Sequence, residues 1–184
     1  QKTPDPDVPD SNFVDNNCDG IDGDATQAIF ASPNGDDTFA GTRETPVKTI
    51  AQALKLAQQK GLPGVYLDKG IYSGSVTMVA GIGIYGGYDS GNLWSRSAAN
   101  DTQIVGGTTA ITGSGINKET HIELVSVKSA DGTSPGQSSY GVFIANSSGP
   151  IILGQLKVNA GNATTGAVGA AGTVGSNGQT PAAA

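Results

Sequence analysis

The chain contains 184 residues and has a formal net charge of −6, and this length fits one domain. Glycine supplies 28 residues, about twice its usual share. Aromatic residues make up 5% and charged residues 14% of the chain. No apolar run is long enough to span a membrane as a helix. The composition therefore excludes a membrane span and predicts a domain with few bulky core side chains and few ion pairs.

The negative charge is concentrated at the start of the chain. Residues 1–41 contain nine aspartates and one lysine, so they carry −8, and the rest of the chain carries +2. Such a region repels nucleic acid and attracts a hard cation that prefers carboxylate oxygens. Because Cys18 is the single cysteine, it forms no disulfide within the chain and no thiolate zinc site. It is either a free thiol or an intermolecular link.

Composition divides the chain into three parts. Residues 1–26 are acidic, and their Pro/Asp-rich opening, residues 1–12, is expected to be an extended tether. Residues 27–160 carry the apolar pattern, and residues 161–184 contain no charged side chain. In the middle part, residues 28–31 are typical of a short strand. Residues 50–60 have the apolar spacing of a helix, with Thr49 as N-cap and Gly61 as C-cap.

After Gly61 the apolar period changes from that of a helix to that of short strands. The strand centres follow one another at intervals of 17, 20, 20 and 19 residues, a spacing typical of solenoid coils. We therefore predict an all-β fold, a parallel β-helix whose stacked coils form aliphatic ladders, with helix 50–60 capping the first coil. A β-sandwich is the alternative. The centres are Leu67, Ile84, Ile104, Leu124 and Phe143.

Residues 27–160 also contain a set of short motifs that occur together in one family. They are AIF at 28–30, GDD at 35–37, GT at 41–42, Pro46, TI at 49–50, AL at 53–54, GIY at 70–72, IYGGY at 84–88 and WSR at 94–96. In these motifs the chain resembles right-handed parallel β-helix proteins of the pectate-lyase-like superfamily, especially bacterial surface proteins. The resemblance implies right-handed coils and a secreted or cell-surface bacterial protein. It implies little about activity, because the same solenoid carries lyases, hydrolases, adhesins and stalks.

Oxygen-bearing side chains alternate along residues 15–24 with the spacing of an EF-hand loop, and Gly20 occupies the turn position. The position of the closing glutamate is taken by Thr26, so Asp22 or Asp24 would complete the shell. This pattern predicts a structural calcium site or, alternatively, a solvated acidic turn held by Asx hydrogen bonds. The segment FVDNNCDGIDGD (13–24) is similar to Asp/Asn-rich metal-binding loops of secreted bacterial proteins, including copper-binding surface proteins. The candidate calcium ligands are Asp15, Asn17, Asp19, the carbonyl of Ile21, Asp22 and Asp24.

A second candidate site is aromatic and consists of Tyr85, Tyr88, Trp94 and Arg96. Flat rings can stack on sugars, and an arginine can bind hydroxyl or carboxylate groups through two N–H donors. Alternatively, these rings pack back on the coil. The single histidine, His121, is expected at the surface directly before a strand. No serine or cysteine has an identifiable base partner, so the sequence predicts no nucleophilic triad.

Glycine recurs at every third position from residue 166 to residue 178. This Gly-x-y tail suits a polyproline-II-like segment, a flexible linker, or a segment held by contacts with another copy. We expect a secreted, non-catalytic, calcium-stabilised structural protein of the bacterial surface, whose partners are other copies of itself in an extracellular assembly or filament. The alternative is a carbohydrate-binding module or degenerate polysaccharide lyase that binds cell-surface polysaccharide through the aromatic residues.

Overall fold

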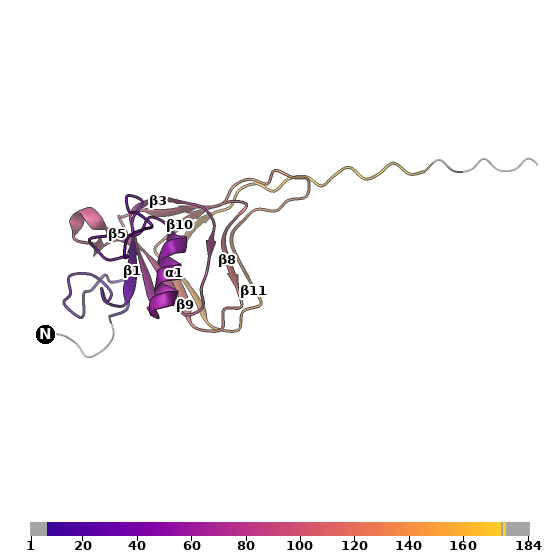
Figure 1. Cartoon of the computed structure of the whole chain (residues 1–184). Coiled ribbons are helices and arrows are strands. Elements are labelled where there is room, and N and C mark those ends of the chain that lie inside the picture. The colour runs from indigo at the N-terminus through magenta and orange to yellow at the C-terminus, as the bar shows by residue number, and fades with distance from the viewer. Residues whose placement is uncertain (1–6, 174, 176–184) are drawn as a thin grey trace, which may run out of the picture.

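A computed structural model describes residues 7–173 and residue 175, and these residues form a parallel β-solenoid with an N-terminal segment beside it (Figure 1). The strands belong to three sheets. Sheet A contains β1 (Ala28–Ala31), β2 (Gly64–Asp68), β5 (Gly83–Asp89), β9 (Thr120–Glu123) and β12 (Ile151–Gly154), with β6 (Ser95–Arg96) beside β5. Sheet B contains β3 (Gly70–Ser73), β7 (Thr102–Val105), β10 (Ser126–Lys128) and β13 (Lys157–Asn159). Sheet C contains β4 (Val76–Thr77), β8 (Thr109–Ser114) and β11 (Tyr140–Ala145).

The coils stack in parallel, as predicted. Among the described strands every pair is parallel except β5 with β6. In sheet A, Val65 pairs with Ile84, Ile84 with Ile122, and Ile122 with Leu153. Like side chains therefore lie above one another in a ladder, and the backbone hydrogen bonds run between coils. The β-sandwich alternative is wrong, because it requires facing antiparallel layers.

The predicted constant coil length is wrong after the first coil. The sheet A ladder lies at positions 65, 84, 122 and 153, so its steps are 19, 38 and 31 residues. Ile104 belongs to sheet B and Phe143 to sheet C, so the predicted centres mix three sheets. Two segments lengthen the later coils. Residues 90–101 contain the 3-10 helix η1 (Ser90–Asn92) and β6, and residues 129–139 join β10 to β11.

The corner between sheets A and B is formed in the same way in two coils. Leu124 follows β9 and Gln155 follows β12, and their φ angles are 54° and 50°. Both residues adopt the left-handed conformation, which ordinary residues rarely enter. Leu124 was expected to lie inside a strand, but this backbone geometry makes it the turn that redirects the chain toward sheet B.

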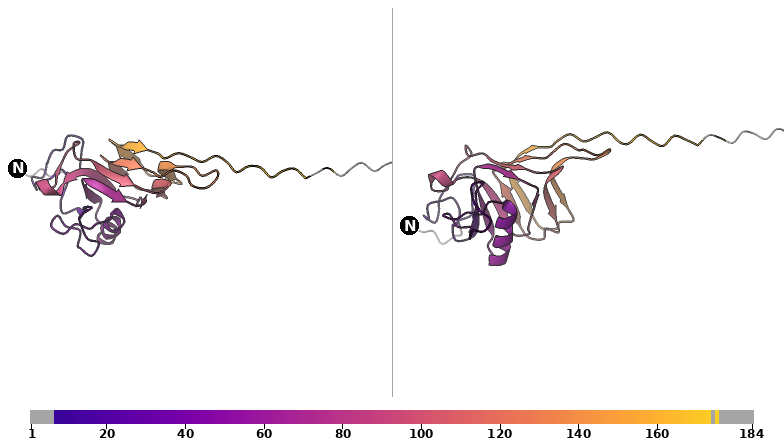
Figure 2. Two further views of the ribbon diagram at one scale, coloured as in Figure 1. Left: turned by 90° about the horizontal axis from the view of Figure 1, so that it is seen from above. Right: turned by 45° about the horizontal axis from the view of Figure 1, so that its top comes forward.

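The helix α1 (Ile50–Lys60) has the predicted bounds and caps. The Thr49 side chain accepts a hydrogen bond from the Gln52 N–H, and Gly61 has a φ of 67°. The helix buries Ile50, Ala53, Leu54 and Ala57 against the first coil. Figure 2 shows α1 at one end of the stack, opposite β12 and β13. No helix in the described part of the chain is long and apolar enough to cross a membrane.

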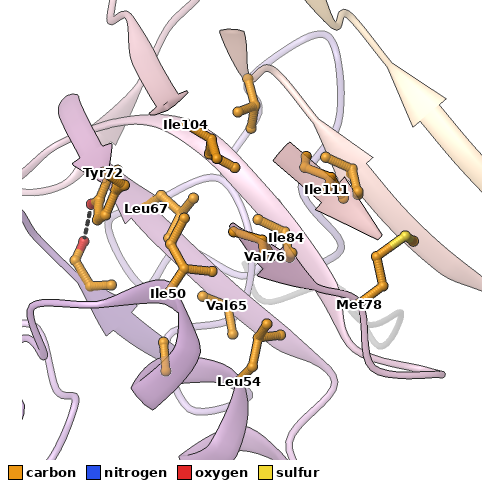
Figure 3. Packing of buried hydrophobic residues seen from close by; sticks show 14 of the residues in the cluster. Ile50, Leu54, Val65, Leu67, Tyr72, Val76, Met78, Ile84, Ile104 and Ile111 are labelled. Carbon is orange, nitrogen blue, oxygen red and sulfur yellow. Dashed lines mark hydrogen bonds between the residues drawn. The ribbon is translucent and has the colours of Figure 1, made fainter. Parts of the chain in front are cut away.

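The solenoid interior is an aliphatic core, part of which Figure 3 shows. Tyr72 is its polar exception: its hydroxyl donates to the Ala31 carbonyl at 2.8 Å or to the Asp68 carbonyl at 3.1 Å. The burial of each ladder ends abruptly at the last coil. In sheet B, Ile104 and Val127 are 0% and 1% exposed, whereas Val158, the next residue of the same ladder, is 52% exposed. The core is therefore covered by α1 at one end and open at the other.

Residues 7–27 do not behave as a free tether. Asp7 and Pro9 are buried, and the segment packs along the outer face of sheet A. At the other end, residues 161–165 still bond to the loop 131–137, for example through the Gly136 N–H and the Thr165 carbonyl at 2.8 Å. From Gly166 to Thr173 every residue is exposed, and the chain runs away from the solenoid (Figure 1). The predicted Gly178 lies outside the described residues.

The first prediction compares the same substitution in two layers of one ladder. Val127→Ala should lower the free energy of unfolding by about 2 kcal/mol, because it removes fully buried methyl groups and leaves a cavity. Val158→Ala should cost less than about 0.5 kcal/mol, because half of this side chain is already in water. Chemical denaturation at a concentration where the chain is monomeric measures both. Equal costs would contradict an open last coil.

Candidate functional site

The outer face of sheet A carries a second apolar cluster, which the N-terminal segment covers. Its centre is a set of aromatic side chains on neighbouring strands. Phe30 on β1 meets Tyr66 on β2 edge to face at 5.5 Å and meets Trp94 at 4.8 Å, and Tyr66 stacks on Tyr88 at 4.9 Å. Phe30 and Tyr66 point outward because side chains alternate along a strand, while their neighbours fill the solenoid core. Tyr88 follows a register shift in β5, and Trp94 lies between η1 and β6. The cluster attaches the N-terminal segment to the solenoid.

A buried ion pair lies beside this cluster. The Arg96 side chain is 0% exposed and donates to an Asp22 carboxylate oxygen at 2.9 Å. Arg96 also donates to the Gly86 carbonyl and to the Asp10 carbonyl, each at 2.9 Å. Burial raises the pKa of the Asp22 carboxyl, and its contact with Arg96 acts in the opposite direction. Because Asp10 and Asp22 belong to the N-terminal segment, this arginine binds the segment to sheet A.

Aromatic rings surround the Arg96 guanidinium. It lies 5.6 Å from the ring centres of Phe13 and Tyr88 and 5.8 Å from that of Tyr85. Its second terminal nitrogen is buried and has no hydrogen-bond partner among the described residues, although the Glu123 carboxylate lies 3.9 Å away. The rings and carboxylates replace water around this charge.

The predicted aromatic site is packed rather than open. Tyr88 is 0% and Trp94 4% exposed, and both use their polar atoms internally. The Tyr88 hydroxyl donates to the Asp22 carbonyl at 2.6 Å, and the Trp94 indole N–H donates to the Arg43 carbonyl at 3.2 Å. Neither ring presents a face to a sugar. Tyr85, at 5% exposed, differs because it lines a pocket.

Three of the predicted calcium ligands lie close together. The Asp15 carboxylate accepts from the backbone N–H groups of Asp19 and Gly20, and the Asn17 side chain donates to the Asp19 carboxylate at 3.0 Å. Asp19 is also paired with Arg43 at 3.2 Å. The loop is therefore closed by its own Asx hydrogen bonds, and Cys18 beside it is exposed.

The other predicted ligands have different roles. Asp22 is paired with Arg96, Asp24 accepts from Thr26, and the Ile21 side chain is buried in the aromatic cluster. Across residues 7–173, no group of three or more His, Cys, Asp or Glu side chains is arranged to hold a metal ion. Calcium binding stays a prediction that rests on Asp15, Asn17 and Asp19.

A pocket of 420 Å³ opens between the N-terminal segment and the outer face of sheet A. It is lined by rings and by acidic side chains, and sequence reasoning missed most of them. The detectable signal was the alternation Glu119, His121, Glu123, which places two titratable side chains on one face of β9 and a third directly before it. The lining includes Asp24, Tyr66, Tyr85, Glu119 and His121.

His121 lies within β9 rather than before it, and its side chain is 19% exposed. Its Nδ1 lies 2.7 Å from Glu123 and its Nε2 lies 3.0 Å from Glu119. Burial lowers the pKa of His121, but the hydrogen bonds and charges of Glu119 and Glu123 outweigh it and raise that pKa overall. Protonated His121 thus stabilises the fold fully below its unfolded pKa, and this contribution is lost as the pH rises through the raised value.

Comparison with known proteins concerns the first part of the solenoid. Residues 33–84 match the model of a family described as Protein of unknown function (DUF1565), which is associated with β-helix proteins. The matched stretch runs from the turn after β1 through α1 into β5. No curated protein and no solved structure matches the chain. The match and the parallel sheets agree on the architecture.

The second prediction concerns the buried ion pair. Asp22→Asn should lower the free energy of unfolding by about 3–5 kcal/mol, because it leaves the Arg96 charge buried without its counter-charge. The double variant Asp22→Leu/Arg96→Met should recover much of this loss, since it removes both charges. Fluorescence of Trp94, the single tryptophan, reports the unfolding of this region. An unchanged midpoint for Asp22→Asn would show that the pair does not hold the segment.

The third prediction concerns calcium. If Asp15, Asn17 and Asp19 hold the ion together with water, millimolar calcium should raise the melting temperature of chelator-treated protein by a few degrees. Asp15→Asn should abolish this shift, and magnesium should not reproduce it. An identical melting temperature with calcium and with chelator would show that the hydrogen-bonded turn needs no metal.

Proposed function

We propose that this chain is a non-catalytic structural module of a secreted or cell-surface assembly, and that it associates with another copy through its last coil. The observation that supports this is the sudden exposure of the ladders there. Leu153 and Val158 are 46% and 52% exposed, although their partners one coil earlier, Ile122 and Val127, are fully buried. In the described part of the chain β11, β12 and β13 are edge strands, so the backbone groups on their outer sides have no strand partner at the same end.

The geometry favours a closed pair over a filament built by strand stacking alone. Continuous growth requires two complementary ends, but α1 covers the first coil. Two open ends can still meet face to face, and such an isologous contact uses the same surface on both copies. A filament would need a second contact, for which the exposed segment 166–173 is available.

The non-catalytic part of the proposal is supported by how His121 is held. Both of its ring nitrogens bond to glutamates, so neither is free to activate a serine or cysteine. The competing function is sugar binding by Tyr85, Tyr88, Trp94 and Arg96. It has less support, because Tyr88, Trp94 and Arg96 are buried and only Tyr85 among these four lines a pocket. The secreted, bacterial setting rests on the resemblance to β-helix surface proteins.

The fourth prediction tests association through the last coil. Sedimentation equilibrium over a range of concentrations should show a reversible monomer–dimer step. The double variant Leu153→Glu/Val158→Glu should remain monomeric, because association would bury two unpaired charges. Leu93→Glu is the matched control: it places a charge on a side chain that is 83% exposed near η1, away from the last coil, and should dimerise like the parent.

Two results would contradict the proposal. The parent chain staying monomeric up to about 1 mM would mean that the open coil does not attract another copy. Unchanged dimerisation of the double variant would place the contact elsewhere. Circular dichroism and Trp94 fluorescence establish beforehand that both variants are folded.

A further inference from the structure

The pocket beside His121 lies on the outer face of sheet A, and none of its lining residues belongs to the last coil. Its walls come from three coils and from the N-terminal segment: Gly64 and Tyr66 on β2, Gly83 and Tyr85 on β5, and His121 on β9. Pro9 and Asp24 close it from the other side. Its 420 Å³ would hold a group the size of a long amino-acid side chain.

The pocket lining is negatively charged. It includes Asp7, Asp24 and Glu119, and no lysine or arginine belongs to it. Asp7 bonds to the Asn16 backbone N–H at 3.0 Å, whereas Asp24 and Glu119 each have one carboxylate oxygen without a hydrogen bond in the described part of the chain. An anionic ligand would be repelled by these groups, and a cation would be attracted.

A second, independent feature points to a bound ligand. Tyr85 is 95% buried, and its hydroxyl has no hydrogen-bond partner among the described residues. The hydroxyl lies over Gly83, where a Cβ atom would come within 2.6 Å of the phenol oxygen. Glycine at position 83 therefore makes room for the Tyr85 hydroxyl, which opens to the pocket. Because the rest of the Tyr85 side chain is buried, a partner for this hydroxyl can come only from the pocket side, and an N–H donor bound there would supply one.

We propose that this pocket binds an organic cation that carries N–H donors, an alkylammonium or guanidinium group, between the Tyr66 and Tyr85 rings and the carboxylates of Asp24 and Glu119. The carboxylates attract the cation and accept its hydrogen bonds, and the two rings form the apolar wall against its carbon chain. The Tyr85 oxygen accepts a further N–H. The source is either a free amine or a basic side chain of a peptide, because both present the same group.

The charge on His121 should tune this binding. As the imidazolium loses its proton, the pocket becomes one charge more negative, so cation affinity should rise with pH. Glu119 and Glu123 hold the ring, and Tyr85 lies 5.9 Å from it. The other charged groups near it are Asp7 and Asp24 on the pocket wall, Lys118 beside Gly81, and Arg96 over the far side of the Tyr85 ring.

Calorimetric titration of the full chain with agmatine tests the proposal. We expect saturable binding with a dissociation constant in the millimolar range or tighter. Glu119→Gln and Asp24→Asn should each weaken it about fivefold or more, since each removes one negative charge. Tyr85→Phe should also weaken it, because it keeps the ring and removes the hydroxyl. Asp131→Asn, far from the pocket, is the matched control and should bind like the parent.

Further arms of the same experiment identify the ligand chemistry. Nα-acetyl-arginine amide binding better than agmatine would identify a peptide side chain as the source, and the reverse would identify a free amine. Agmatine should bind more tightly at pH 8 than at pH 5, and His121→Gln should remove this difference. Binding of glucose without binding of agmatine would overturn the proposal in favour of a neutral sugar. Equal agmatine affinity in Glu119→Gln and in the parent would overturn it as well. Trp94 fluorescence confirms that each variant is folded.

Discussion

Burial of each coil under the next is the constraint on which this structure depends. The core residues of one layer leave water only when another layer lies on them, so the solenoid has two ends that need a cover. At the first coil α1 supplies the cover with Ile50, Ala53, Leu54 and Ala57. At the last coil no described element does so, and Leu153 and Val158 stay half in water. The structural role that we propose follows from this difference between the ends.

The outer face of sheet A is organised by a different interaction. A flat sheet exterior would face solvent, but here the aromatic residues of β1, β2 and β5 attract the N-terminal segment, and Arg96 bonds to two of its aspartates. The segment then encloses a pocket lined by aromatic rings and carboxylates, whereas the open coil exposes aliphatic side chains. In our proposal the open last coil serves assembly, whereas this lateral surface serves ligand recognition.

The sequence predicted the helix 50–60, the strand at 28–31 and the parallel stacking, because each depends on local apolar spacing and caps. It did not predict coil length, because the strands of all three sheets have similar apolar runs, and the predicted centres came from different sheets, with Ile104 in sheet B and Phe143 in sheet C. From the sequence, the acidic loop at residues 15–24 and the aromatic motif at residues 85–96 were interpreted as two separate sites. The ion pair of Asp22 with Arg96 joins them across 74 residues, and no local pattern reveals a contact of that kind. The Glu119, His121, Glu123 alternation was present in the sequence, but only His121 was considered, and it was expected at the surface.

The corner segments have a consequence for how such a scaffold can change. Each coil adds only about 4.8 Å along the solenoid axis, so the stack of coils is short. The width of the molecule across this axis is set by the segments that project at the corners. Residues 90–101 and 129–139 leave and rejoin the coil without disturbing the register of the layers above and below. Lengthening or replacing residues 129–139 would therefore change the outline of the molecule while the strand register stays the same. Residues 90–101 are less free to change, because Trp94 and Arg96 hold the N-terminal segment. The length and sequence of a projecting segment such as 129–139 can therefore vary while the stacked strands stay the same.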